Sequence, residues 1–151
     1  MKKTILKLLS LLFILNVFMV SPPVVSANTS MGIQAMTESQ AYHRFLNRPK
    51  NEVSKLSFLI DRFRDMGVTV IYEGHEYDAD KAAQFAKKYV RENYKSSDGP
   101  AESWIKLHCY RSEASNEIIQ FRFPDKKEKP VRDVLLGELT ALNQVMASSK
   151  K

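Results

Sequence analysis

A polar segment from Tyr110 to Asn116 holds the side chains best suited to recognise a ligand. Arg111 carries a planar, permanently charged guanidinium that matches the geometry of a carboxylate or a phosphate. Serine hydroxyls and an asparagine amide lie nearby, and loops carry function more often than the elements they join. The same residue types are also ordinary in a solvated loop. The predicted binding residues are Arg111, Ser112, Ser115 and Asn116, with Tyr77 or Tyr110 beside them.

The adjacent pair His108-Cys109 is a second candidate for chemistry, because a histidine can activate a thiol nucleophile. Neighbouring residues on a helix point about 100° apart, so these two side chains do not easily share a hydrogen bond. The base would have to be His75 or His43, brought close by folding. No oxyanion motif accompanies the cysteine, and a lone cysteine in apolar surroundings is commonly buried. A small hydrolase or thiol enzyme using Cys109 with a histidine is therefore the alternative hypothesis, and we assign no catalytic residue.

A third cluster combines carboxylates with a histidine, which are possible ligands for a divalent cation. Ala79 stands where the helix of a zinc protease would have its second histidine. Acids at a turn and a helix N-terminus are explained equally by capping and by the helix dipole. We therefore predict no metal site and no cofactor. The residues of this cluster are Glu73, His75, Glu76, Asp78 and Asp80.

The N-terminus has the organisation of a cleavable signal peptide over residues 1–27. Lys2 and Lys3 precede an apolar run from Leu8 to Val20, and small residues lie around Ala27. At about 1.5 Å per residue that run covers roughly 20 Å, less than the hydrocarbon thickness of about 30 Å that a membrane anchor must cross. We therefore predict an exported bacterial protein, periplasmic or secreted, with no stable membrane insertion after cleavage.

The charge balance argues against a nucleic-acid partner. The whole chain has 23 basic and 17 acidic residues and a net charge of +6, but three of the lysines lie in the predicted signal peptide. The remaining charge of +3 does not by itself make the concentrated basic face that nucleic acid requires. One basic turn could touch anionic lipid headgroups or cell-wall polymer, or only aid solubility. Its residues are Lys126, Lys127, Lys129 and Arg132.

The segment 52–66 is predicted to be a helix because its apolar residues recur at three- and four-residue steps. Asn51 is a typical N-cap for this helix, and Gly67 stands where a left-handed C-cap residue is needed. The β-branched and aromatic residues of 68–72 favour a strand. A tight Glu-Gly turn and a short return strand over 75–77 should follow.

Asp78 should cap a second long helix over 79–94, and Pro100 should begin a shorter third one. Apolar and polar residues alternate over 117–123, as in a strand, and a charged turn follows. A last helix should start near Val131, and a short turn or helix can form around 41–46. The apolar stripe of the second helix, which we expect in the core, consists of Ala82, Phe85, Ala86, Tyr89 and Val90.

These elements predict an α+β fold with three to four helices packed on a small antiparallel β-sheet, since no βαβ alternation is present. Residues 28–37 have no clear periodicity and are predicted to be a flexible leader. Residues 38–147 then form a single domain, a typical size for one core. A lone cysteine cannot form an internal disulfide, so stability must come from apolar packing.

Three pieces of this pattern resemble the DUF5329 family of small exported bacterial proteins. The first is 70–79 (VIYEGHEYDA), the second joins 101–105 (AESWI) to 111–115 (RSEAS), and the third is 131–139 (VRDVLLGEL). The resemblance implies export and a shared fold, but no activity. The chain departs from the family in having Glu73 for asparagine, Phe85 for histidine and no glycine in the serine-rich loop. Any function of that histidine would be missing here.

Together these observations favour a non-enzymatic binding module for an unknown protein or envelope component. The thiol-enzyme alternative requires an accessible thiol with a lowered pKa. A structural or assembly subunit is a third possibility, which an exposed apolar patch would favour.

We predict that protein recovered from an exporting bacterial host begins at about Asn28, because signal peptidase removes residues 1–27. Intact-mass measurement of the envelope and medium fractions tests this prediction. A full-length mass confined to the membrane fraction would instead identify the N-terminal segment as an anchor.

Overall fold

The computed structural model describes residues 35–149, so the predicted signal peptide lies outside the described residues. Within that range five α-helices pack with one four-stranded antiparallel sheet, whose strand order is β2-β1-β3-β4. Two short 3-10 helices span Met36–Glu38 and Ser96–Asp98. The helices are α1 (Gln40–Leu46), α2 (Glu52–Asp65), α3 (Ala79–Asn93), α4 (Ala101–His108) and α5 (Val131–Ser148). The strands are β1 (Thr69–Tyr72), β2 (His75–Tyr77), β3 (Gln120–Arg122) and β4 (Glu128–Pro130).

The predicted α+β class is confirmed, with two differences of detail. There are five α-helices among the described residues instead of three to four, because the short segment before Pro49 is a helix of its own, α1. The charged turn predicted after β3 leads into a fourth strand, β4, which pairs with β3 at the sheet edge. β4 has no apolar alternation, and Pro130, which lacks an N–H, suits an edge position. These features explain why the sequence pattern did not predict β4.

Residues 28–37 were predicted to be a flexible leader, but residues 35–37, the part that the structure describes, belong to the fold. Met36 lies in a 3-10 helix and is buried in the core. Ser39 caps α1 by accepting a hydrogen bond from the Tyr42 amide. The aperiodic sequence of this stretch did not indicate that its methionine contributes to the core.

The predicted helix starts and turns are confirmed. The Asn51 side chain accepts a hydrogen bond from the Ser54 amide at 2.9 Å, and Asp78 accepts one from the Lys81 amide at 2.8 Å. The β1–β2 turn has positive φ at both central residues, 51° at Glu73 and 71° at Gly74. Two such residues form the tight turn whose twist matches that of the paired strands.

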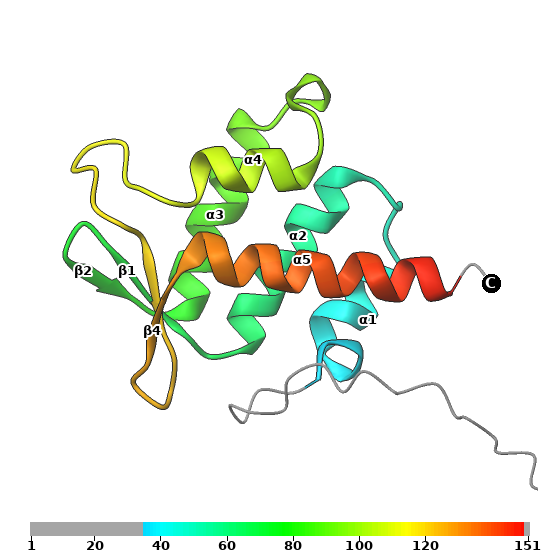
Figure 1. Cartoon of the computed structure of the whole chain (residues 1–151), viewed down its shortest axis with the longest axis horizontal. Coiled ribbons are helices and arrows are strands. Elements are labelled where there is room, and N and C mark those ends of the chain that lie inside the picture. The colour runs from blue at the N-terminus through cyan, green and yellow to red at the C-terminus, as the bar shows by residue number, and fades with distance from the viewer. Residues whose placement is uncertain (1–34, 150–151) are drawn as a thin grey trace, which may run out of the picture.

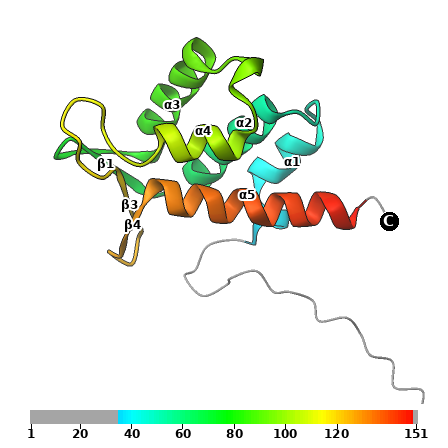
Figure 2. The same ribbon diagram turned by 45° about the horizontal axis from the view of Figure 1, so that its top comes forward.

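Helix α2 occupies the centre of the molecule and contacts α1, α3, α4 and α5. The sheet lies at one end of the helical layer, and α5 runs along one side of the other helices (Figures 1 and 2). Residues Phe58 to Phe63 of α2 are all buried, so this helix contributes apolar side chains in several directions. The same buried stretch includes two charged residues, Asp61 and Arg62.

The Asp61 carboxylate joins three helices through ion pairs. Its side chain is 1 % exposed, and it lies 2.8 Å from Arg48 Nη2 and 3.3 Å from Arg44 Nε, both in or after α1. Lys87 of α3 approaches the other carboxylate oxygen at 2.9 Å. Burial acts to raise the pKa of this carboxyl, but the hydrogen bonds from Lys87 and Arg48 outweigh burial and hold the pKa below its usual range.

The next residue, Arg62, connects α2 to α5. Its side chain is 4 % exposed, and Nε donates to the Glu138 carboxylate at 2.9 Å. Because a buried charge without a partner is costly, the two adjacent pairs set the positions of α1, α3 and α5 around α2.

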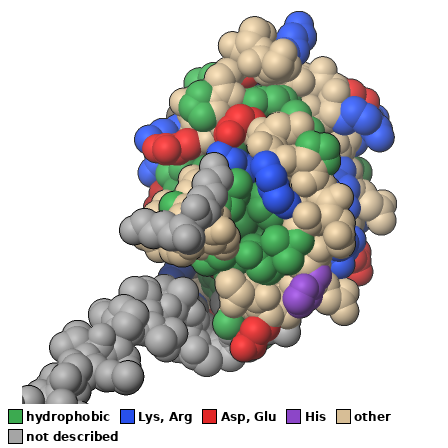
Figure 3. Space-filling view, turned by 90° about the vertical axis from the view of Figure 1, so that its right-hand side faces the viewer, with side chains coloured by type: hydrophobic (Ala, Val, Ile, Leu, Met, Phe, Trp, Pro, Cys, Tyr) green, Lys and Arg blue, Asp and Glu red, His purple; other side chains and the backbone are tan. Residues whose placement is uncertain are grey.

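The surface of the molecule has apolar areas as well as charged ones. Figure 3 shows hydrophobic side chains gathered in the middle of the face at the C-terminal end of α5, with basic side chains around them. None of the helices between residues 35 and 149 combines the length and apolar character needed to cross a membrane.

We predict that Asp61→Asn lowers the free energy of unfolding by about 3 kcal/mol at pH 7, because it removes the shared partner of several cations. Urea unfolding followed by circular dichroism measures the loss. Glu102→Gln is the matched control, since it removes a pair with Lys106 in which both side chains are 57 % exposed. Its cost should be below about 0.5 kcal/mol, and equal costs for the two variants would contradict the account.

The same carboxylate gives the stability a pH dependence. The pKa of Asp61 is lower in the fold than in the unfolded chain, so its contribution is complete above the ordinary aspartate pKa. That contribution is lost as the pH falls through the lower folded value. Unfolding free energies measured below about pH 5 should therefore fall more steeply for the wild type than for Asp61→Asn.

Candidate functional site

A cavity of about 480 Å³ lies between one face of the sheet and helices α2 to α5. Its lining is mostly aliphatic and aromatic, and small-molecule sites commonly have volumes of about 300–1,000 Å³ with a few polar groups in an apolar wall. Its lining residues from the helices are Leu56, Leu59, Ile60, Phe63, Ala82, Phe85, Ala86, Tyr89, Val90, Trp104, Ile105, His108, Val131 and Leu135. The sheet and the loop before it add Val70, Tyr72, Tyr77, Cys109, Arg111, Glu113, Ile119 and Phe121.

The sheet wall follows from strand register. Val70 of β1 lies opposite Tyr77 of β2 and Phe121 of β3, so these three side chains point to the same face. Tyr72, two residues further along β1, shares that face because the side-chain period of a strand is two. All four residues line the cavity. The predicted binding residue Tyr77 is therefore placed at the site.

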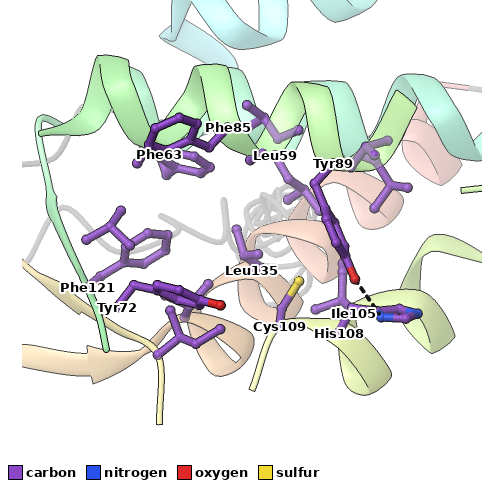
Figure 4. A pocket seen from close by; sticks show the side chains of 18 of the residues that line it. Leu59, Phe63, Tyr72, Phe85, Tyr89, Ile105, His108, Cys109, Phe121 and Leu135 are labelled. Atoms are coloured by element: carbon purple, nitrogen blue, oxygen red, sulfur yellow. Dashed lines mark hydrogen bonds between the residues drawn. The ribbon is translucent and has the colours of Figure 1, made fainter. Parts of the chain in front are cut away.

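Helix α3 forms one wall of the cavity and leaves it partly open to solvent. Ala82, Ala83 and Val90 of α3 are buried, whereas the two aromatic members of its apolar stripe are not. Phe85 is 54 % exposed and Tyr89 is 37 % exposed, although both line the cavity. Figure 4 shows Phe85 and Tyr89 on one side of the open space and Tyr72 and Cys109 on the other. The stripe predicted to lie in the core thus lies in part at the mouth of a cavity.

Three polar side chains form a small cluster on the α4 side of the cavity mouth. The Tyr89 hydroxyl donates to the Glu113 carboxylate at 3.2 Å and lies 3.4 Å from Nδ1 of His108 (Figure 4). Burial raises the pKa of Tyr89, and the negative charge of Glu113 raises it further, so the hydroxyl stays protonated. The His108 ring also packs on Trp104, with ring centroids 4.7 Å apart.

The loop predicted to bind a ligand uses several polar groups for its own structure. Ser112 is buried, its hydroxyl donates to the Glu73 carboxylate, and its Oγ accepts from the Ala114 amide at 3.2 Å. Ser115 is exposed, and its Oγ accepts a 3.4 Å hydrogen bond from the Glu117 amide. The two serines therefore have roles in shaping the loop, and their binding role stays a prediction.

Arg111 is exposed and lines the cavity. Its Nη1 donates to the Asn116 carbonyl at 2.7 Å, and Asn116 adopts a positive φ of 58°. The Tyr110 ring has the Arg111 guanidinium 5.1 Å from its centre and the Arg132 guanidinium 3.8 Å from it. The structure thus brings Arg111 and Tyr77 together at the cavity, whereas Tyr110 and Asn116 support Arg111 from the loop.

Cys109 follows α4 and lines the cavity, with its sulphur pointing into the space in Figure 4. Burial raises the pKa of this thiol to about 12. A thiol enzyme needs the opposite shift, because the thiolate is the nucleophile. This environment gives the alternative hypothesis of a thiol enzyme no support.

The acidic cluster that we considered as a metal site is used structurally. Asp78 caps α3, and Glu76 pairs with Arg122 across the sheet. The Glu73 carboxylate accepts the Ser112 hydroxyl. Within residues 35–149 no group of three or more His, Cys, Asp and Glu side chains is arranged to hold a metal ion.

Comparison of the chain with protein-family models, curated proteins and solved structures finds no match. The resemblance to the DUF5329 family therefore stays a prediction.

Of the predicted binding residues, Arg111 and Tyr77 line the cavity, but the sequence did not indicate that a cavity exists. Phe85 and Tyr89 have the spacing of a helix stripe that packs against a core, and the same spacing serves a helix that covers a hollow. From the sequence, His108 was weighed only as a neighbour of Cys109, and Glu113 was treated only as part of a polar loop. Both contact the Tyr89 hydroxyl, from which they are 19 and 24 residues away in the sequence. No local sequence pattern indicates such contacts.

We predict that Cys109 in the folded protein reacts with a thiol reagent at pH 7 at least roughly 100-fold more slowly than free cysteine, because burial keeps it protonated. Labelling with a chromogenic disulfide reagent measures the rate. Adding urea to unfold the same sample should restore prompt reaction and is the internal control. Prompt labelling of the folded form would contradict this prediction and favour the thiol-enzyme alternative.

Proposed function

We propose that this protein is an exported, non-enzymatic binding module for an envelope or extracellular component, and that it holds an apolar part of that component in the cavity. Membership of the DUF5329 family and removal of a signal peptide belong to the same proposal. The volume of about 480 Å³ and the largely apolar lining support a small molecule or a chain of a lipid as the bound part.

The observation that carries the proposal is the exposure of Phe85 and Tyr89 at the cavity mouth. Leaving a large apolar side chain half in water forgoes part of the roughly 1.5–3 kcal/mol that its full burial would contribute. A ligand that enters beneath α3 would cover these rings and recover that free energy. Tyr77 meets the Phe85 ring edge-on at 6.0 Å, so part of the surface that the ligand would meet is already in place.

A catalytic role has less support from the same residues. The thiol of Cys109 is held protonated, and the Ser112 hydroxyl is buried and directed to Glu73. His108 packs on Trp104 and lies next to a tyrosine hydroxyl. None of these contacts forms a nucleophile, base and oxyanion arrangement.

The test is a titration of the exported protein with N-phenyl-1-naphthylamine, a neutral apolar dye that fluoresces when it leaves water. We expect saturable binding at one site. Energy transfer from Trp104, the sole tryptophan of the chain, reports proximity, because this indole lines the cavity. Phe85→Ala should weaken binding about fivefold to tenfold, equivalent to roughly 1 kcal/mol of lost apolar contact.

Leu107→Ala is the matched control, because Leu107 is the most exposed large apolar residue described at 76 % and does not line the cavity. Its affinity for the dye should equal that of the wild type. Both substituted side chains are largely exposed, so both variants should fold. Equal losses in the two variants, or no saturable binding by the wild type, would contradict the proposal.

A further inference from the structure

We propose that the ligand of this cavity is an amphiphile with one anionic end, a carboxylate or a phosphate, and that Arg111 binds that end at the mouth. This inference rests on the proposed function, because it assigns the polar end of a molecule whose apolar part occupies the cavity. This inference is narrower than the proposed function. A cavity that binds any apolar molecule would agree with the proposed function, but only a preference for an anionic end would agree with this inference.

The histidine, arginine and glutamate side chains of the lining come from one short stretch of chain. His108, Arg111 and Glu113 lie within six residues, at the end of α4 and in the loop that follows. The remaining lining residues are aliphatic or aromatic apart from Cys109. An apolar wall with charge at one place matches a molecule that is apolar along its length and polar at one end.

Two of these three groups share one neutral contact, the Tyr89 hydroxyl. Glu113 accepts the Tyr89 hydroxyl, and His108 lies beside the same oxygen. Arg111 makes no ion pair with any carboxylate among residues 35–149, whereas Arg44, Arg48, Arg62 and Arg122 each do. The Arg111 guanidinium is therefore the cation at the mouth to which a ligand would supply an anionic partner.

The Arg111 side chain is also held in place before any ligand binds. One of its five N–H donors is used by the Asn116 carbonyl at 2.7 Å, which leaves the guanidinium with further donors. The Tyr110 ring lies beside the guanidinium, and the Arg132 guanidinium on that ring adds positive charge to the same region. A fixed guanidinium loses little side-chain entropy on binding and suits the two oxygens of a carboxylate or phosphate.

Three probes with twelve carbon atoms each test the charge requirement: dodecanoate, dodecyl phosphate and dodecan-1-ol. Each displaces the naphthylamine dye from the exported protein, and the displacement gives its affinity. We expect one or both anions to bind roughly tenfold more tightly than the alcohol, the size of effect typical of a charge-assisted hydrogen bond. The carboxylate and the phosphate results together show which anion the site prefers.

Variants then locate the charge. Arg111→Gln should reduce the preference for the anions to about twofold or less while leaving the affinity for dodecan-1-ol unchanged. Glu113→Gln should retain or increase the preference, because it removes a negative charge from the mouth. Arg91→Gln, at an exposed position of α3 outside the lining, controls for net charge and should keep the wild-type preference.

The outcomes separate this inference from the proposed function. Equal affinity for the alcohol and both anions overturns the anionic end and leaves the apolar site standing. Absence of binding for all three probes and the dye overturns both. Loss of alcohol binding in Arg111→Gln would mean that the residue only maintains the fold. A preference for the anions that is fully kept in Arg111→Gln would overturn the assignment of the anionic end to Arg111.

Discussion

Two adjacent buried charges on helix α2 determine how the rest of the molecule is arranged. Asp61 receives cations from the α1 region and from α3, and Arg62 pairs with Glu138 of α5. Side chains at neighbouring positions of a helix point about 100° apart, so these pairs hold different helices on different sides of α2. The cost of leaving either charge unpaired makes other packings of these helices unfavourable.

This arrangement also explains why the domain has an open cavity. Lys87 anchors α3 to α2 by an ion pair, and the small side chains of Ala82 and Ala83 form its buried contacts. The larger Phe85 and Tyr89 stay partly exposed at the cavity, although Tyr77 of the sheet contacts the Phe85 ring. Helix α3, attached in this way, provides one wall of the cavity.

Local patterns predicted most of the fold and little of the site. Asn51, Asp78 and Gly67 have roles within a few residues of their own positions, and the alternation around Phe121 is equally local. By contrast, the three cations that lie 2.8–3.3 Å from the Asp61 carboxylate come from positions 13 to 26 residues away. The cavity depends on how completely α3 closes on the sheet, and its apolar stripe has the same spacing in either case. Ser112 looked like a ligand-binding hydroxyl because sequence does not show that its side chain turns inward to Glu73.

The most direct test of the account is to locate a bound alkyl chain by nuclear Overhauser effects between dodecanoate and the isotope-labelled exported protein. If the alkyl chain occupies the cavity, its methylene protons contact Phe85, Tyr89 and Leu135, which line it. The account also predicts that the chemical shifts of Arg111 change with the carboxylate end. Contacts confined to the apolar face at the C-terminal end of α5, seen in Figure 3, would contradict the account.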